Sequence, residues 1–383
     1  MRKVCVVLSA RPSYSRIKSA LGAINNHKDL ELQLVLTASS LLDKYGEVIK
    51  NVKADNYKVS AEVFMLIEGE TLLTSAKTTG LGIIEIANVF NQLKPDIVVT
   101  IADRYETLAT AVAASYMNIP LAHVQGGEIT GSIDEKVRNA VTRLSDIHLV
   151  ATKNAVERLK RMGEHPDTIF LTSCPSIDIA SSVKRKEELE FDIISKYGGV
   201  GADLDMSLGY IVVLQHPVTT EWEEAQEQVT KTLRAIRDLD YNAIWLWPNS
   251  DAGSDGISKG IRIFREFEQT NRIRYFTHFP PEDFIRILQH SKGIVGNSSV
   301  GIRECSYLGI PTVNIGSRQM GRERGKNVID VGYNYDEIKK AVRKQWENGH
   351  YDSEVLYGRG GAGKKIAGIL ADIELSIEKS LSY

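Results

Sequence analysis

The chain has 383 residues, more than a single hydrophobic core usually supports, so we expect two domains. Hydrophobic residues make up 43% and charged residues 25%, the proportions of an ordinary globular protein. The formal net charge of -2 excludes a general attraction to nucleic acid or to an anionic membrane. An anionic ligand must therefore be bound by a local cluster of cations and backbone N–H groups.

Cysteine usage and hydropathy indicate the compartment. Cys5, Cys174 and Cys305 lie far apart and have neither metal-ligand nor CxxC spacing, which predicts buried, reduced thiols. No run approaches the roughly 18 apolar residues of a membrane span. We expect a soluble, cytoplasmic protein with no cofactor, no bound metal, and no nucleic-acid or membrane partner.

In the first half, short apolar runs alternate with longer amphipathic stretches, which predicts parallel strands joined by crossover helices. The predicted strands are Val4–Leu8, Leu32–Thr37, Ile97–Ile101, Leu121–Val124, Ile147–Val150 and Ile169–Leu171. The predicted helices between them include Ser15–Asn25, Gly82–Leu93 and Glu106–Met117. Because the strands lack polar alternation, we expect a sheet that is buried on both faces.

From Ser181 to Gly209 the sequence becomes charged and glycine-dotted, which we interpret as the passage between domains. The strands predicted after it are Tyr210–Leu214, Ala243–Trp247, Ile273–Phe276, Gly293–Val295 and Thr312–Ile315, and Lys364–Ser380 is predicted to be a closing helix. We therefore expect an α/β protein with two Rossmann-like domains, residues 1–180 and 205–362, facing each other across a cleft, and a closing helix within residues 363–383. Such sheets bind ligands at the carboxyl ends of their strands.

Polar residues follow the first strand, where a dinucleotide-binding fold would carry G-x-G-x-x-G. That motif is absent, which argues against NAD or FAD. Arg11 and Ser15 are placed to reach a phosphate at the N-terminus of the following helix. A helix cap at Ser13 or Ser15 would explain the same residues without a ligand.

Carboxylates follow two later strands of the same predicted sheet. Asp103 and Arg104 stand at the end of one strand, as an acid/base pair above a substrate would, or as a helix cap with a surface ion pair. The next strand is followed by Gly126 and Gly127 and then by Glu128 and Asp134. Paired glycines let the backbone approach a ligand closely. We therefore predict carboxylate chemistry at this edge of the sheet.

The second half carries signs of phosphate binding. His216 ends the first strand there, a position at which a lone histidine is more often structural. Ser298 and Ser299 follow the fourth strand and are predicted to open a helix, whose N–H groups and dipole would bind an anion. Arg318 begins a loop with three arginines, which suits a bidentately held diphosphate. The G-x-x-x-x-G-K at 358–364 lacks the following Ser or Thr and a preceding strand, which argues against ATP hydrolysis.

In this order, the segments resemble the hydrolysing UDP-N-acetylglucosamine 2-epimerases of sialic and legionaminic acid synthesis. The motifs cover nearly the whole chain: A-R-P-S-Y-S, A-D-R-Y-E, H-V-Q-G-G-E-I-T-G-S-I-D, S-C-P-S-I-D, Q-H-P-V-T-T, N-S-D-A-G-S, G-N-S-S-V-G-I-R-E and G-S-R-Q-M-G-R-E. The family has a glycosyltransferase-B-like fold of two Rossmann domains, which agrees with the strand pattern.

The resemblance implies conversion of UDP-N-acetylglucosamine and water to N-acetylmannosamine and UDP. A carboxylate removes the C2 proton while UDP leaves C1 in an anti elimination, and the resulting 2-acetamidoglycal then takes up water. The implied catalytic residues are Asp103, Glu128, Asp134 and His216, the last contacting phosphate or assisting proton transfer. The implied substrate-binding residues are Arg11, Ser15, Arg104, His123, Gln125, Ser254, His278, Phe279, Ser298, Ser299, Glu304 and Arg318. Among them, Glu304 is expected at the ribose hydroxyls, and His278 and Phe279 at the nucleobase.

The sequence departs from the family at two positions. Several relatives have Glu where this chain has Gln125, and some have His where it has Ile101. Because an amide cannot act as a base, either Glu128 takes that role or Gln125 only binds the sugar, and the identity of the first base stays open. A homodimer or homotetramer is expected.

Other functions fit parts of the pattern. The same reaction on a UDP- or GDP-linked 2,4-diacetamido-2,4,6-trideoxy sugar is one alternative. A non-hydrolysing UDP-GlcNAc 2-epimerase is another, but it lacks the G-G-E-x-T-G-S-I-D and Q-H-P-V-T-T segments. A retaining glycosyltransferase would need an acceptor site, and no motif marks one. A non-catalytic nucleotide-sugar sensor is the alternative of another class, and release of free UDP would separate it from an enzyme.

Overall fold

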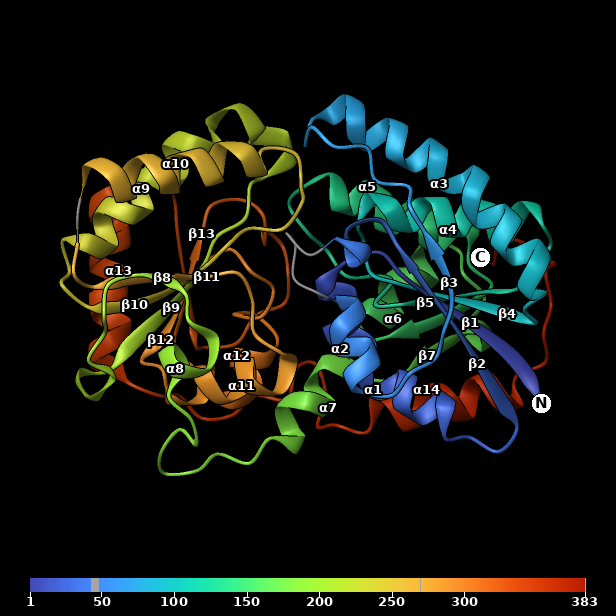
Figure 1. Ribbon diagram of the computed structural model, residues 1–383. Coiled ribbons are helices and arrows are strands. Elements are labelled where there is room, and N and C mark those ends of the chain that lie inside the picture. Colours follow the sequence, from blue (N-terminus) through green and yellow to red (C-terminus); the bar gives the residue numbers. More distant parts are fainter. Residues whose placement is uncertain (43–47, 269, 383) are drawn as a thin grey trace. The chain divides into compact units, whose positions relative to one another are not determined.

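The computed structural model describes residues 1–42, 48–268 and 270–382 (Figure 1). The chain forms two compact units. The first unit comprises Met1–Glu128, Ile133–Ser181 and Tyr357–Tyr383, and the second comprises Ile129–Ser132 and Ser182–Leu356. Each unit is an α/β fold built around a mainly parallel sheet, as the alternation of strands and helices predicts.

The sheet of the first unit has seven parallel strands in the order β3-β2-β1-β4-β5-β6-β7. They are β1 (Arg2–Leu8), β2 (Leu30–Thr37), β3 (Val59–Val63), β4 (Ile97–Ile101), β5 (Leu121–Val124), β6 (Ile147–Val150) and β7 (Ile169–Leu171). The order reverses between β1 and β4. In a doubly wound sheet the ligand site lies beyond the carboxyl ends of the two strands at this switch point.

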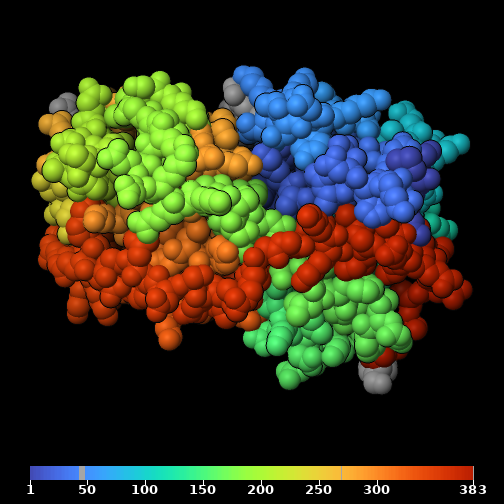
Figure 2. All heavy atoms as spheres, turned by 90° about the horizontal axis from the view of Figure 1, so that it is seen from below, coloured from blue at the N-terminus to red at the C-terminus, as the bar shows by residue number. Residues whose placement is uncertain are grey.

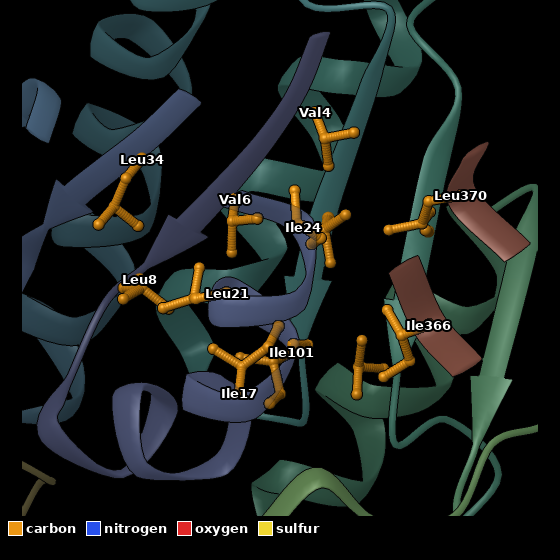
Figure 3. Packing of buried hydrophobic residues seen from close by; sticks show 14 of the residues in the cluster. Val4, Val6, Leu8, Ile17, Leu21, Ile24, Leu34, Ile101, Ile366 and Leu370 are labelled. Atoms are coloured by element: carbon orange, nitrogen blue, oxygen red, sulfur yellow. The ribbon is translucent and has the colours of Figure 1, made fainter. Parts of the chain in front are cut away.

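Helices cover both faces of this sheet. They are α1 (Arg11–Asn25), α2 (Val48–Ala54), α3 (Leu72–Leu93), α4 (Tyr105–Tyr116), α5 (Ile133–Leu144), α6 (Lys153–Arg161), α7 (Pro175–Ser182) and α14 (Ala362–Asp372), with 3-10 turns η1 (Ala38–Leu41) and η3 (Pro166–Thr168). Successive side chains of a strand point to opposite faces. Val4, Val6 and Leu8 therefore pack with α1 and α14 (Figure 3), while Cys5 and Val7 pack with α3 and α4.

The C-terminal segment completes the first unit, and Figure 2 shows it in red against the blue N-terminal segment. The prediction of a helix from Lys364 to Ser380 is wrong beyond Asp372. Ile373 and Leu375, two residues apart, both pack against the core, as side chains on one side of an extended chain do. Residues 357–362, expected in the second domain, also belong to the first unit.

The G-x-x-x-x-G-K segment is the N-terminus of α14. A carboxylate of the same unit occupies it, because Asp178 accepts hydrogen bonds from the backbone N–H groups of Ala362 (3.0 Å) and Gly363 (2.8 Å). The donors that would hold a phosphate in a P-loop are thus bound to Asp178.

The second unit has the strand order β14-β13-β12-β9-β10-β11-β8, parallel except for β8, which pairs antiparallel with β11. Its strands are β8 (Val200–Gly201), β9 (Tyr210–Leu214), β10 (Asn242–Leu246), β11 (Ile273–Phe276), β12 (Gly293–Gly296), β13 (Thr312–Ile315) and β14 (Val328–Val331). Here the order reverses between β9 and β12, so the carboxyl ends of these two strands mark the candidate site.

The helices of the second unit are α8 (Ile193–Tyr197), α9 (Ala225–Arg237), α10 (Ser254–Phe267), α11 (Pro281–His290), α12 (Glu304–Leu308) and α13 (Tyr335–Asn348), with 3-10 turns η4 (Met206–Leu208) and η5 (Thr219–Glu224). Apolar side chains of α9, α10 and α13 pack on one face of the sheet around Trp245. No helix in the described part of the chain is both long and apolar enough to cross a membrane.

Candidate functional site

The first unit places a cationic group at its switch point. α1 begins at Arg11, and its N-cap Ala10 has no side-chain cap, so neither Ser13 nor Ser15 caps the helix. Arg11 and Ser15 are instead in the first turns of α1. Burial and the nearby charge of Arg104 lower the pKa of Arg11 to about 10. Two guanidinium groups held close together at a helix N-terminus form an arrangement that suits an anion.

Asp103 follows β4 and forms ion pairs with two arginines that were not predicted from the sequence motifs. Its Oδ2 accepts a hydrogen bond from Nη2 of Arg138, and its Oδ1 lies 3.5 Å from Nη1 of Arg16. Asp103 is 4% exposed and Arg138 is fully buried. Arg104 is also buried (7% exposed), so the interpretation of this segment as a surface ion pair is wrong.

Arg138 on α5 connects Asp103 to the acidic loop. Its Nη1 donates to the backbone oxygen of Glu128 (2.9 Å) and to Oε2 of Glu135 (3.1 Å). Charge-assisted bonds from one rigid guanidinium to three acceptors fix their mutual positions. Glu128 is itself buried, and Asp134 lies in the first turn of α5, partly exposed. Arg138 thus brings Asp103, the backbone of Glu128 and the carboxylate of Glu135 together, and Asp134 is the residue before Glu135.

Arg104 has a different partner. Its Nε and Nη2 donate to the two carboxylate oxygens of Glu106 at 3.1 and 2.9 Å, in a bidentate pair with little exposure. A fork of this kind holds a guanidinium in one orientation. Glu106 therefore positions the charge of Arg104 near Arg11.

His123 was predicted to bind substrate, and its environment argues against this. Its Nε2 donates to the backbone oxygen of Ala102 (2.8 Å), so Nδ1 is the acceptor for the Thr142 hydroxyl (3.1 Å). The ring is fully buried, and burial lowers its pKa to about 4. Both ring nitrogens of His123 make hydrogen bonds inside the unit. The neutral ring thus stabilises the backbone at Ala102, which has a left-handed φ of 63°.

Gln125, which was also predicted to bind the sugar, is fully buried at a φ of 68°. Its Nε2 donates to Sγ of Cys174 at 3.1 Å. Its Oε1 has no hydrogen-bond partner among the described residues. The Gln125 side chain thus links the turn before Gly126 to Cys174 in the interior of the unit.

In the second unit, His216 lies between two asparagines at the end of β9. The Asn297 side chain accepts from the His216 backbone N–H (2.7 Å) and donates to its backbone oxygen (2.8 Å). Nδ1 of His216 accepts from the backbone N–H of Asn249 (3.2 Å). Because Nδ1 is an acceptor, the neutral ring carries its proton on Nε2. His216 is thereby prepared as a hydrogen-bond donor.

The backbone oxygen of Asn297 also anchors the arginine loop. It accepts from Nη1 of Arg318 (3.3 Å) and Nε2 of Gln319 (2.9 Å). Nη2 of Arg318 lies 3.9 Å from Oδ2 of Asp251. Asn297 thus joins the loop after β13 to His216, so the second unit presents an imidazole donor and a guanidinium together.

The segment after β12 is not a helix start, contrary to the prediction. Residues 299–303 form successive turns, and α12 begins only at Glu304 and has five residues. The turn hydrogen bonds use the N–H groups of residues that follow the two serines, for example Ile302 N–H to the backbone oxygen of Ser299 (3.1 Å). The predicted anion site at Ser298 and Ser299 therefore stays a prediction that depends on a turn and not on the N-terminus of a helix. Glu304 is buried at the first residue of α12.

Two other residues that were predicted to bind the substrate make contacts within the second unit. The Ser254 hydroxyl donates to the backbone oxygens of Asn249 and Asp251. Phe279 is 6% exposed, and its ring packs against Tyr197 and Phe276 with centroids 4.9 and 5.0 Å apart. Ser254 and Phe279 therefore shape their loops, whereas His278 is partly exposed.

Sequence reasoning missed Gln215, which precedes His216. It is fully buried, and neither polar atom of its side chain has a hydrogen-bond partner among the described residues. Buried amides are normally satisfied, so these two atoms call for a polar partner, which a bound water molecule or a ligand would supply. Within the described residues, no group of three or more His, Cys, Asp and Glu side chains is arranged to hold a metal ion.

Comparison with known proteins identifies the family of the chain. A profile of the UDP-N-acetylglucosamine 2-epimerase family matches residues 22–371. The chain belongs to this family. It is 32% identical over 98% of its length, and 97% of the relative's, to a UDP-N,N'-diacetylbacillosamine 2-epimerase (hydrolyzing) of Legionella pneumophila. It is 30% identical to a UDP-N-acetylglucosamine 2-epimerase of Neisseria meningitidis, over 94% of this chain and 92% of that one.

Solved structures share the fold. The UDP-GlcNAc 2-epimerase of Methanocaldococcus jannaschii, in complex with UDP-GlcNAc and UDP, has a TM-score of 0.80 at 19% identity, over 96% of this chain and 99% of that one. The enzyme of Neisseria meningitidis bound to UDP-GlcNAc has a TM-score of 0.77 at 18% identity, with the same coverage. The fold is therefore the glycosyltransferase-B-like fold that the resemblance implied.

Proposed function

We propose that this member of the family is a hydrolysing 2-epimerase, which converts UDP-N-acetylglucosamine and water to N-acetylmannosamine and UDP. The observation that carries the proposal is the buried carboxylate of Asp103, oriented by Arg138 beside the loop that bears Glu128. Removal and return of a proton at one carbon needs more than one carboxyl group close to it. The first unit carries more than one carboxyl group near its switch point.

In the first step, Asp103 takes the proton from C2, a double bond forms between C1 and C2, and the C1–O bond to UDP breaks with its electron pair leaving on the diphosphate. In the second, water adds its oxygen to C1 and a proton is delivered to C2 on the opposite face. Glu128 and Asp134 are the proposed proton donors for that return. One water molecule is consumed, and the sugar is released without its nucleotide.

The developing charge on the diphosphate needs donors that are fixed before the reaction. In the second unit, Arg318 and Nε2–H of His216 are proposed to supply them, with both held by Asn297. In the first unit, the Arg11 and Arg104 pair is proposed to add positive charge. A neutral His216 acts in this scheme as a hydrogen-bond donor and not as a base.

The hydrolysing outcome is supported by the name of the Legionella pneumophila relative. A second hydrolysing relative, from Campylobacter jejuni, is a GDP/UDP-N,N'-diacetylbacillosamine 2-epimerase that is 29% identical over 87% of this chain. These two relatives favour a second candidate substrate, the UDP-linked 2,4-diacetamido sugar. The reaction at C1 and C2 is the same for both substrates.

The test is to supply each UDP-sugar to the purified protein in heavy-oxygen water and in deuterated water. We expect release of free UDP, one heavy oxygen at C1 of the sugar at early times, and one deuterium at C2. A product that keeps UDP would instead identify a non-hydrolysing epimerase, and no turnover of either sugar would reject the enzyme proposal.

Asp103→Asn is expected to abolish turnover while UDP affinity measured by calorimetry stays within about twofold. The matched control is Asp167→Asn, which removes a carboxylate that is 90% exposed on the same unit. Full activity in Asp103→Asn would show that another group removes the C2 proton.

A further inference from the structure

Residues 373–382, which follow α14, form a C-terminal strap that is neither helix nor strand and is held to the first unit at both ends. At its start, Ile373 and Leu375 pack against the hydrophobic core. At its end, the backbone N–H of Ser382 donates to the backbone oxygen of Gly163 (2.9 Å). Between these two anchors the side chain of Lys379 turns inward and is 21% exposed. The strap thus carries one cation into the first unit.

The ammonium group of Lys379 binds the C-terminus of α5. Its Nζ donates to the backbone oxygens of Thr142 (3.4 Å) and Ser145. The last carbonyl groups of a helix have no donor within the helix, and the helix dipole favours a cation beside them. The strap therefore supplies part of the cap that α5 needs at this end.

Glu164 holds the ammonium group in place. Its Oε2 accepts from Nζ of Lys379 (2.5 Å) and from Nε2 of His148 (2.9 Å), and its Oε1 accepts from Nη1 of Arg143. Burial by itself raises the pKa of Glu164, but the hydrogen bonds from His148 and Lys379 lower it to about 2, so the carboxylate is charged. Burial lowers the pKa of His148, so its ring is a neutral donor. Lys379 is thus fixed by a buried anion, unlike a mobile lysine at the surface.

α5 is also the helix that carries both supports of Asp103. Arg138 donates to the carboxylate of Asp103, and the Thr142 hydroxyl binds the ring of His123, which holds the backbone of Ala102. Arg138 and Thr142 are four residues apart and therefore lie on the same face of the helix. The backbone oxygen of Thr142 is one of the two acceptors of the strap. A shift of this helix end would therefore move both supports together.

We propose that Lys379 is a positioning residue for the removal of the C2 proton, and that it acts through α5 on the orientation of Asp103. This inference rests on the proposed function, because it gives the strap a part in the same reaction. With Lys379 bound, the last turn of α5 is fixed and Arg138 keeps its place beside the carboxylate. Without the ammonium group, the carbonyl oxygens at the end of α5 lose their donor, and Asp103 is held less precisely.

The test is Lys379→Met in the full chain, a change that removes the cation and keeps an unbranched side chain. Turnover of the UDP-sugar is expressed per folded molecule, with the folded fraction read from circular dichroism. We expect kcat to fall by about tenfold or more, because a small displacement of a reacting group is enough for such a loss. KM and the calorimetric affinity for UDP are expected to stay within about threefold. Lys379→Arg keeps the cation and should restore most of kcat, and Lys365→Met, which removes an exposed lysine of α14, should match wild type.

Hydrogen exchange measured without any nucleotide sugar separates this inference from the proposed function. The amides of residues 141–145 are expected to exchange about tenfold faster or more in Lys379→Met than in Lys365→Met, because local opening of the last turn becomes easier. Unchanged exchange there, or an unchanged kcat in Lys379→Met beside an active wild type, would overturn the positioning role alone. A wild type that turns over neither UDP-sugar would overturn the proposed function, and the positioning role with it.

Discussion

Replacing Arg138 by methionine is the sharpest test of the carboxylate site. The side chain is fully buried and contacts Asp103, the backbone of Glu128 and Glu135. Removing one partner of a buried ion pair leaves an uncompensated charge, and such changes cost about 3–5 kcal/mol. We expect Arg138→Met to lower the free energy of unfolding by that amount, measured by urea denaturation at neutral pH.

The same variant is expected to change the chemistry and not only the stability. With one cation fewer beside Asp103, the protonated carboxyl is favoured, so the acid limb of the pH profile of kcat/KM is expected to move to higher pH. Loss of a correctly oriented base lowers kcat by about 100-fold or more, with a smaller change in KM. UDP release from the UDP-sugar is the assay.

Two variants serve as controls for Arg138→Met. Arg138→Lys keeps the cation but not the planar fork of donors, so we expect it to restore most of the pH profile and only part of the stability. Arg161→Met removes an exposed arginine from α6 of the same unit and is expected to match wild type. The reasoning is refuted if Arg138→Met is destabilised while its kcat and pH profile stay those of wild type, because Arg138 would then have only a structural role.

Three further predictions concern single residues. Arg318→Ala is expected to weaken UDP binding by about tenfold or more, since a hydrogen bond to a charged group contributes about 1.5–3 kcal/mol; unchanged calorimetric affinity would count against the diphosphate contact. Nitrogen NMR of His216 at neutral pH is expected to show the proton on Nε2 and an unprotonated Nδ1, and the reverse pattern would contradict the bond from Asn249. His123 has its pKa lowered by burial from 6.5 to about 4, so the unfolded chain binds this proton at higher pH than the folded one. Its contribution to stability is fully present above about pH 6.5 and is lost as the pH falls toward 4, by up to about 3 kcal/mol. Urea denaturation across that range in wild type and His123→Gln tests this, and an equal pH dependence in both would assign the effect to other groups.

The strands at the centre of both sheets could be predicted from the sequence, whereas of the four edge strands only β7 (Ile169–Leu171) was predicted. Central parallel strands such as Ile97–Ile101 are continuous apolar runs, because both of their faces are buried. β3 (Val59–Val63) contains Ser60 and Glu62 and was missed, since it lies at the sheet edge and is only partly buried. β14 (Val328–Val331) was missed for the same reason.

Within the candidate site, the residues that follow strand ends could be predicted from the sequence. The residues that hold them in place by hydrogen bonds and ion pairs could not. Asp103 and His216 follow buried strands directly, which is a local signal. Arg138 lies on the amphipathic helix α5, where an arginine reads as a solvent-facing residue, and its burial arises only when α5 packs beside Asp103. The role of Asn297 similarly depends on the pairing of β9 with β12.

The path of the chain has a consequence for biosynthesis. Ile366 and Leu370 of α14 pack into the same core as the first strand, yet they follow every residue of the second unit in the chain. While a ribosome is still making the second unit, the surface of β1 and α1 that α14 will cover is open to water. The second half of the protein therefore has the opportunity to fold first, and the nascent first half depends on that delay being short or on protection by a chaperone.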